Sequence, residues 1–332
     1  MKPTNQLFDL IHSLTTDEEA LFVNASSIQQ GDKNYLKLYN YLKQQDIYDE
    51  AEVKEHFKNE VFIQHLASEK NQLLHHVLKS LRFYRYETSL SAKINESIKN
   101  IQILFNKSLY KQSRKQLSII KKQASDNDLF YCLLEIIELE KVLVDMEAYY
   151  GDINFKTVNE LIDEENNIFL KIENLAAYDI QLAKLNRLSS KLMIARNASD
   201  VEEINTILKD TQQLAETKGF LSKKSKIIYT YAIGVCNRLL NELANEHRLF
   251  SDLIIEMETN PDIISEMPNY YILSHGHLIR YYALKKQYND GFMLIDKLKS
   301  LSLNKMFKAT DVQISIFIQS YINEILLYSY IG

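Results

Sequence analysis

The feature that most constrains the fold of this chain is its lack of residues that break helices. Prolines occur only at positions 3, 261 and 268, so none interrupts residues 4–260. A proline inside a helix removes a backbone hydrogen bond and clashes with the preceding turn, so long helices can form here. Only seven glycines occur in the chain, whereas tight β-hairpin turns need glycine or asparagine at positive φ. Apolar residues recur instead at the three- and four-residue spacing of a helix face. The sequence therefore predicts an all-α fold.

Composition and cysteine content indicate a globular protein of the cytoplasm. The chain is 46% hydrophobic and 25% charged, which is ordinary for a folded protein. Cys132 and Cys236 are far apart in the sequence and lack metal-ligand spacing, which predicts core thiols in a reducing compartment and not a disulfide. The opening residues, MKPTNQLFDLIHSL, predict an amphipathic helix and not a secretory signal.

The last apolar stretch, residues 312–332, has the length of a membrane span. Four polar residues interrupt it: Gln313, Gln319, Asn323 and Glu324. We therefore expect a buried final helix and no contact with a membrane. Since its apolar residues leave little polar face, two alternatives stay open: the helix lies inside the fold, or it pairs with a second copy in a homodimer through residues 312–331.

Charge is distributed unevenly along the chain, whose net charge is −5. Residues 58–125 hold 13 Lys or Arg against 4 Glu, a net of +9, and residues 126–180 hold 14 acids against 3 Lys, a net of −11. Two interpretations stay open. The charged segments bind a partner of opposite charge, or neighbouring helices of opposite charge face one another.

Residues 1–90 predict a bundle of four short helices closed by one long helix. Thr15 or Thr16 is an N-cap followed by acids. One short helix turns four apolar residues to one face: Tyr35, Leu38, Tyr39 and Leu42. The long helix, from about Ser68, has a stripe of five: Leu73, Leu74, Val77, Leu78 and Leu81.

Beyond residue 90 a pattern of helix, short polar corner and second helix recurs. Three stretches carry it: SIKNIQILFNKSLYKQSRKQLSIIKKQA from Ser97, IGVCNRLLNELANEHRLFSDLIIEMETNP from Ile233 and HGHLIRYYALKKQYNDGFMLIDKLKSL from His275. In the third, Gly291 is a small residue placed where the two helices touch. Ser113 has this position in the first stretch, whereas the middle one has Leu249.

This unit resembles the tetratricopeptide repeat, although the starting tryptophan of that repeat is missing. Leu278, Ile279 and Tyr282 match the first-helix positions of the family. The resemblance implies an α-α superhelix (a tetratricopeptide-like solenoid) over residues 91–332, whose concave face binds a peptide or another protein. A small helical bundle followed by such repeats is similar to the layout of uncharacterised bacterial cytosolic proteins. This second resemblance therefore implies no particular activity.

Motifs for catalysis and cofactor binding are absent from the sequence. It contains no G-x-G-x-x-G, no P-loop and no G-x-S-x-G. No glutamate stands three residues before a histidine, as a di-iron bundle requires. We predict a non-catalytic scaffold or adaptor with no cofactor and no metal.

Acids of the negative stretch are the candidate partner-binding residues. Glu135 and Glu138 share one helix face, and Glu160 and Asp163 follow on the next helix. Carboxylates grouped in this way favour a basic segment of a partner protein.

The alternative function is a transcriptional regulator that binds DNA through its N-terminal region. Residues 49–85 would form a helix, a connection and a recognition helix. Seven side chains would reach bases and phosphates: Lys70, Asn71, Gln72, His75, Lys79, Arg82 and Arg85. The connection of about ten residues is longer than the three or four usual for this motif, which disfavours the alternative.

Overall fold

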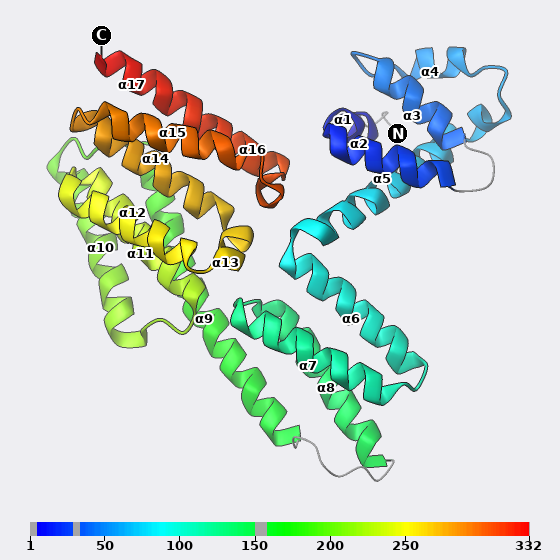
Figure 1. The fold of residues 1–332 in the computed structure, drawn as a ribbon, viewed down its shortest axis with the longest axis horizontal. Helices are drawn as coiled ribbons and strands as arrows, with labels where there is room; N and C mark the ends of the chain where they lie inside the picture. Colours follow the sequence, from blue (N-terminus) through cyan, green and yellow to red (C-terminus); the bar gives the residue numbers. More distant parts are fainter. Residues whose placement is uncertain (1–4, 29–33, 150–157, 332) are drawn as a thin grey trace. The chain divides into compact units, whose positions relative to one another are not determined.

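The computed structural model describes residues 5–28, 34–149 and 158–331, without the side chains of residues 27–28, 84–88 and 147–149. Every regular element in these ranges is a helix (Figure 1). The predicted all-α class is therefore confirmed for the described part of the chain. The chain divides into two compact units, Met1–Thr88 and Ser89–Gly332, which are called unit 1 and unit 2.

Unit 1 is built around one long helix. Its elements are α1 (Gln6–His12), α2 (Thr16–Ile28), α3 (Asn34–Gln44), α4 (Glu50–His56), a 3-10 turn (Val61–His65) and α5 (Leu66–Thr88). Helix α5 packs chiefly against α2 and α3. The four predicted apolar residues of α3 are all buried. Of the predicted stripe of α5, Leu73 and Val77 are fully buried but Leu78 is exposed, so the prediction is wrong at Leu78.

Local capping fixes where the helices of unit 1 begin. The Thr15 backbone N–H donates to Glu18 Oε2 at 2.9 Å, and the Glu18 N–H donates back to Thr15 Oγ1 at 3.4 Å. This reciprocal arrangement is a capping box, and it confirms Thr15 as the N-cap of α2. The Asp49 carboxylate caps α4, because it accepts from the Ala51 N–H at 2.7 Å and from the Glu52 N–H at 3.3 Å.

Unit 2 is a succession of helices that pack mainly against their neighbours in sequence (Figure 1). Its α-helices are α6 (Leu90–Asn106), α7 (Tyr110–Asp126), α8 (Phe130–Tyr149), α9 (Val158–Ser189), α10 (Ala198–Lys218), α11 (Lys223–Leu239), α12 (Leu243–Glu258), α13 (Pro261–Glu266), α14 (Pro268–Leu284), α15 (Tyr288–Leu301), α16 (Thr310–Phe317) and α17 (Asn323–Ile331). A short 3-10 turn (Lys305–Phe307) precedes α16.

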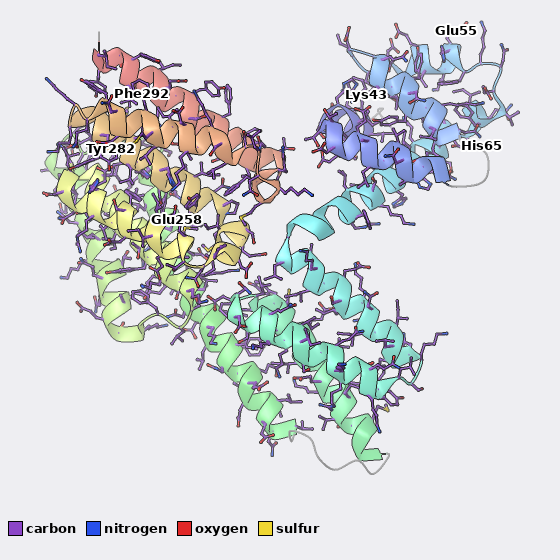
Figure 2. All side chains as sticks on the ribbon, in the orientation of Figure 1. Lys43, Glu55, His65, Glu258, Tyr282 and Phe292 are labelled. Atoms are coloured by element: carbon purple, nitrogen blue, oxygen red, sulfur yellow. The ribbon has the colours of Figure 1, made fainter. Side chains whose placement is uncertain are left out.

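Helix α9 connects two hydrophobic cores within unit 2. Leu161 and Ile168, in its first half, belong to the core of α6–α8, and Tyr178 and Leu185 belong to the core of α10–α17. Leu175 packs against both cores. Polar contacts add to the second core. Glu258 of α12, which Figure 2 labels, accepts hydrogen bonds from the Tyr271 hydroxyl at 2.7 Å and from Lys297 Nζ at 2.6 Å.

Four corners of unit 2 share one backbone geometry. They join α6 to α7, α7 to α8, α11 to α12 and α14 to α15. Each has a non-glycine residue at positive φ: Ser108 (59°), Asp128 (53°), Asn241 (61°) and Lys286 (62°). The N–H of the following residue donates to the carbonyl five residues earlier, at 2.8–3.0 Å in all four corners. This bond defines the Schellman motif, which ends a helix and reverses the chain.

These corners give a register for comparing the hairpins. Five residues after the left-handed position lie Ser113 in α7, Glu246 in α12 and Gly291 in α15. In the middle hairpin the equivalent residue is therefore Glu246 and not Leu249. A Cβ on Gly291 would lie 2.9 Å from Leu327 Cδ1. The close contact that the sequence predicts within the hairpin is thus made with α17.

The C-terminal helices α16 and α17 are joined by a π-helical turn, Ile318–Ile322. One side of this segment is buried through Val312, Ile316 and Leu327. Apolar residues on the other side are exposed, Phe317 by 61% and Ile325 by 70%, so the expectation of a buried final helix is wrong for that side. Within the described ranges, no helix combines the length and the apolar character that crossing a membrane requires.

Candidate functional site

The four predicted partner-binding acids lie on the surface of unit 2. Glu135 and Glu138 are exposed on α8, and Glu160 and Asp163 are exposed in the first two turns of α9. Glu138 already has a basic neighbour, since Lys141 Nζ lies 2.7 Å from its Oε1. The hydrogen bond from Lys141 lowers the pKa of Glu138.

Lysines of unit 2 neutralise part of this acidic surface from within. Lys121 of α7 makes ion pairs with Glu140 of α8 and Glu164 of α9. Lys141 also pairs with Glu165 of α9 at 3.0 Å. At Lys121, a lysine of the basic segment thus pairs with acids of the negative one, as the second interpretation of the charge pattern proposes. A basic partner would have to bind the remaining carboxylates.

The predicted DNA-contacting residues divide into two sets on α5. Lys70 is tied to unit 1, because its ammonium lies 2.7 Å from Glu50 Oε2 and 3.1 Å from the Tyr48 hydroxyl. Hydrogen bonds from Lys54 and then Lys70 lower the pKa of Glu50 to about 2. The other described candidates are exposed on the opposite side of α5: Asn71, Gln72, His75, Lys79 and Arg82. The side chain of Arg85 lies outside the described residues.

A hollow of about 330 Å³ lies where α9, α11 and the α13–α14 junction meet. It is lined by Leu175, Asp179, Lys224, Ile228, Glu266, Met267, Pro268, Asn269 and Tyr270. Its apolar wall comes from leucine, isoleucine, methionine and proline, and its polar groups are one amine, two carboxylates, an amide and a phenol. A few polar groups on an apolar wall are typical of sites that bind small groups or peptide side chains.

Lys224 is the cation of this hollow. Its backbone N–H donates to Asp128 Oδ2 at 3.1 Å, which docks the first turn of α11 on the α7–α8 corner. Its ammonium makes no ion pair within the described part of the chain. Burial lowers the pKa of Lys224, and Glu266 and Asp128 partly oppose that shift. Burial also raises the pKa of the Asp179 carboxyl. The ammonium therefore gains from any ligand that supplies an acceptor.

A second polar cluster lies between α11, α12 and α14. Glu246 is fully buried, and its Oε2 accepts from Arg280 Nη2. Arg238 lies close to both and donates to the Met193 carbonyl at 3.0 Å. Three buried polar atoms have no hydrogen-bond partner among the described residues: Arg238 Nε, Glu246 Oε1 and Arg280 Nε. Two guanidinium groups thus share one carboxylate in this interior.

Two histidines of α14 are held neutral by burial, His277 beside this cluster and His275 near Lys297 and Glu258. His277 stacks on Phe250 with a centroid distance of 4.2 Å. Burial lowers its pKa well below the ordinary value, and Arg238 and Arg280 lower it further. Burial lowers the pKa of His275 to about 4, and its Nδ1 lies 2.8 Å from the Tyr271 carbonyl.

Sequence patterns gave no sign of the hollow or the cluster. Lys224 stands in the run SKKSK, which is typical of a surface segment, and Glu246 stands in the polar run NEHR. Aligning the hairpins on their corners could have identified Glu246. In that alignment the residues equivalent to Glu246 are Ser113 and Gly291, so a carboxylate occupies the position of a small residue. Nothing in the local sequence brings Asp179 and Glu266 near Lys224.

The remaining candidates of the sequence are core residues. Cys132 and Cys236 are buried free thiols, as their apolar surroundings predict, and burial raises the pKa of Cys236 to about 12. Among the described residues, no three His, Cys, Asp or Glu side chains lie close enough together to hold a metal ion. No family model, no curated protein and no solved structure matches the chain.

Proposed function

We propose that the protein is a non-catalytic scaffold whose unit 2 binds a peptide segment of a partner protein. The observation that carries this proposal is the hollow, which lies at the meeting point of α9, α11 and the start of α14. These helices are far apart in sequence, so their exposed sides form one composite surface. Lys224, whose ammonium makes no ion pair with the described residues, supplies a group that gains from a ligand.

The repeated corners support a tetratricopeptide-like superhelix as the architecture of unit 2. A stack of hairpins needs the same reversal at each corner, and four corners have the same Schellman hydrogen bonds. In such a stack each hairpin buries its apolar face on its neighbours and leaves an extended surface for a peptide.

The hollow favours a peptide side chain that combines a hydrogen-bond acceptor with an apolar stem. The acceptor would bind the Lys224 ammonium, and the stem would pack on Ile228 and Met267. The exposed acids Glu135, Glu138, Glu160 and Asp163 are a separate candidate surface for basic residues of the partner. Variants of the two surfaces distinguish them.

The test is selection of binding peptides from a random displayed library on the full chain, followed by titration of the selected peptides. Lys224→Gln is expected to weaken binding about tenfold or more, since a hydrogen bond to a charged group contributes about 1.5–3 kcal/mol. Lys226→Gln is the matched control, because Lys226 is an exposed lysine of the same helix that pairs with Glu256 at 2.8 Å. It should leave the affinity unchanged.

A second variant changes Glu135, Glu138, Glu160 and Asp163 to lysine. Selected peptides that no longer bind this variant but still bind Lys224→Gln would show that the binding surface lies on α8 and α9 and not at the hollow. Failure to select any peptide that binds unit 2 would contradict the scaffold proposal.

We also propose that a second copy of the chain covers the exposed side of α16 and α17. Eight large apolar side chains, each 40–70% exposed, supply this surface: Ile314, Phe317, Ile318, Tyr321, Ile322, Ile325, Tyr328 and Ile331. Light scattering is expected to give a dimer mass for the wild type and a monomer mass for Ile325→Glu, because a charge in an apolar contact must be desolvated. Ile103→Glu, at an isoleucine of α6 that is 58% exposed and lies outside this surface, should stay dimeric. A monomeric wild type at micromolar concentration would contradict the proposal.

A further inference from the structure

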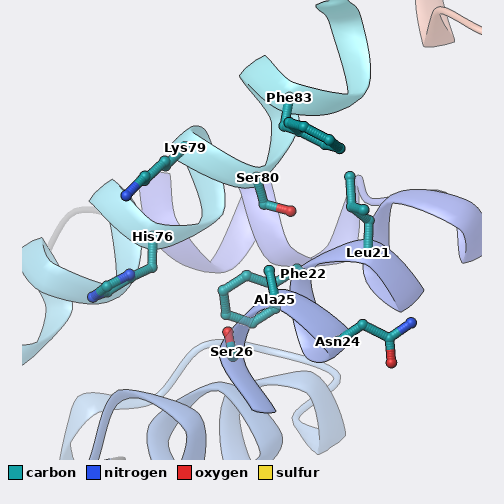
Figure 3. A pocket seen from close by; sticks show the side chains of 9 residues that line it. All are labelled: Leu21, Phe22, Asn24, Ala25, Ser26, His76, Lys79, Ser80 and Phe83. Carbon is teal, nitrogen blue, oxygen red and sulfur yellow. The ribbon is translucent and has the colours of Figure 1, made fainter. Parts of the chain in front are cut away.

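Unit 1 contains a cavity of about 430 Å³ between α2 and α5 (Figure 3). It is lined by Leu21, Phe22, Asn24, Ala25, Ser26, His76, Lys79, Ser80 and Phe83. This volume lies within the range of roughly 300–1,000 Å³ that is usual for small-molecule sites. All of the described residues that line it belong to unit 1.

The wall of the cavity is mainly apolar. Phe22 forms its base, and Leu21 of α2 faces Phe83 of α5 across it (Figure 3). The apolar surface that the cavity exposes is several times larger than its polar surface. Exposed apolar surface of this kind is costly in water, and a hydrocarbon group that fills the cavity removes it.

Ser80 places an unpartnered hydroxyl at this wall. The residue is only 8% exposed, and its Oγ has no hydrogen-bond partner among the described residues. Other helical serines of the chain return their hydroxyl to the carbonyl four residues earlier, as Ser113, Ser274 and Ser320 do. The Ser80 hydroxyl is instead directed toward α2 (Figure 3). Because a buried hydroxyl without a partner carries a desolvation cost, it gains from a ligand acceptor.

Among the described residues that line the cavity, Lys79 is the cationic side chain and no carboxylate occurs. Of the three acids in the first turn of α2, Glu18 bonds to Thr15, Glu19 pairs with Lys43 at 2.9 Å, and Asp17 is exposed. Burial lowers the pKa of His76, which leaves its ring neutral at pH 7. Lys79 is exposed and makes no ion pair with any described residue. Lys79 lines the cavity, and its ammonium points away from Ser80 and Phe83 (Figure 3), so pairing with a ligand requires rotation of the side chain.

We propose that this cavity binds a small amphipathic carboxylate, such as a medium-chain fatty acid. The hydrocarbon chain packs between Leu21, Phe22 and Phe83. The carboxylate accepts a hydrogen bond from the Ser80 hydroxyl and is paired by Lys79. This site is independent of the peptide surface proposed for unit 2.

The test is isothermal titration of the full chain with octanoate, octanol and octylammonium, which share a hydrocarbon chain and differ in head group. Octanoate is expected to bind most tightly and octylammonium most weakly. Ser80→Ala is expected to weaken octanoate binding about tenfold, because a hydrogen bond to a carboxylate is lost. The same change should leave the thermal midpoint unchanged or raise it, since the hydroxyl has no partner in the free protein.

Two alanine variants of α2 form a matched pair. Ala25→Leu fills the cavity and should abolish binding, whereas Ala20→Leu changes an exposed alanine of α2 that does not line the cavity and should bind as the wild type does. Equal binding of octanoate by Ala25→Leu and the wild type would overturn the proposal, as would absence of octanoate binding. Equal affinity for all three ligands would overturn the assignment of a carboxylate.

Discussion

Replacing Glu246 with alanine is expected to lower the free energy of unfolding by about 3–5 kcal/mol. The carboxylate of Glu246 is fully buried and accepts from Arg280, with Arg238 beside both. Without it, two guanidinium groups face each other in a medium of low dielectric constant, and their charges have no compensation. Urea unfolding followed by far-ultraviolet circular dichroism measures this loss.

The control for this prediction is another ion pair of the same helix. Glu256 of α12 pairs with the half-exposed Lys226 at 2.8 Å, and Glu256→Ala should cost less than about 1 kcal/mol because solvent screens that pair. The double variant Glu246→Leu, Arg280→Leu should recover part of the loss, since it removes both charges of the buried pair but leaves Arg238 without a neighbouring carboxylate. A Glu246→Ala protein within about 1 kcal/mol of the wild type would contradict the interpretation of the cluster.

Acid is expected to destabilise the protein through His275. Burial holds the folded-state pKa of His275 at about 4, whereas the ordinary pKa is 6.5. The neutral form is therefore favoured in the folded state. The stabilisation is complete above pH 6.5 and is lost as the pH falls toward 4, because the unfolded chain binds the proton first. The difference of about 2.5 pH units corresponds to about 3 kcal/mol. His277, whose pKa is also lowered, acts in the same direction.

The measurement is the free energy of urea unfolding at several values between pH 7 and pH 4. The variant His275→Gln has no proton to gain at this position, so its stability should fall less over this interval than that of the wild type. The comparison isolates His275 from the carboxylates that titrate near pH 4. Identical pH dependence of the two proteins would contradict the assignment.

The helices and several of their ends could be predicted from the sequence. A lack of proline and the three- and four-residue apolar spacing predicted an all-helical chain, and a threonine at position 15 or 16 followed by acids marked the start of α2. Each of these features is local, because a cap or an apolar face is decided within one or two turns of helix.

Features that depend on distant residues were not predictable in this way. Lys70 has the sequence context of an exposed lysine, yet Glu50 lies 20 positions earlier and binds it. The pattern of α16 and α17 showed that both sides are apolar, but it could not indicate which side α14 and α15 would cover. The hollow at Lys224 could not be predicted from the sequence for the same reason, because its walls come from three separate parts of unit 2.

The neighbour-to-neighbour arrangement of unit 2 has a consequence for how quickly the chain can reach its native state. Most contacts of these helices join segments that are close in sequence, and only a few, such as the bond from the Ser91 N–H to Glu266, link remote positions. Closing short loops costs little chain entropy, so proteins rich in such contacts fold quickly. The core shared by α6, α7, α8 and the first half of α9 can thus assemble once these helices have left the ribosome, before the rest of unit 2 has been synthesised.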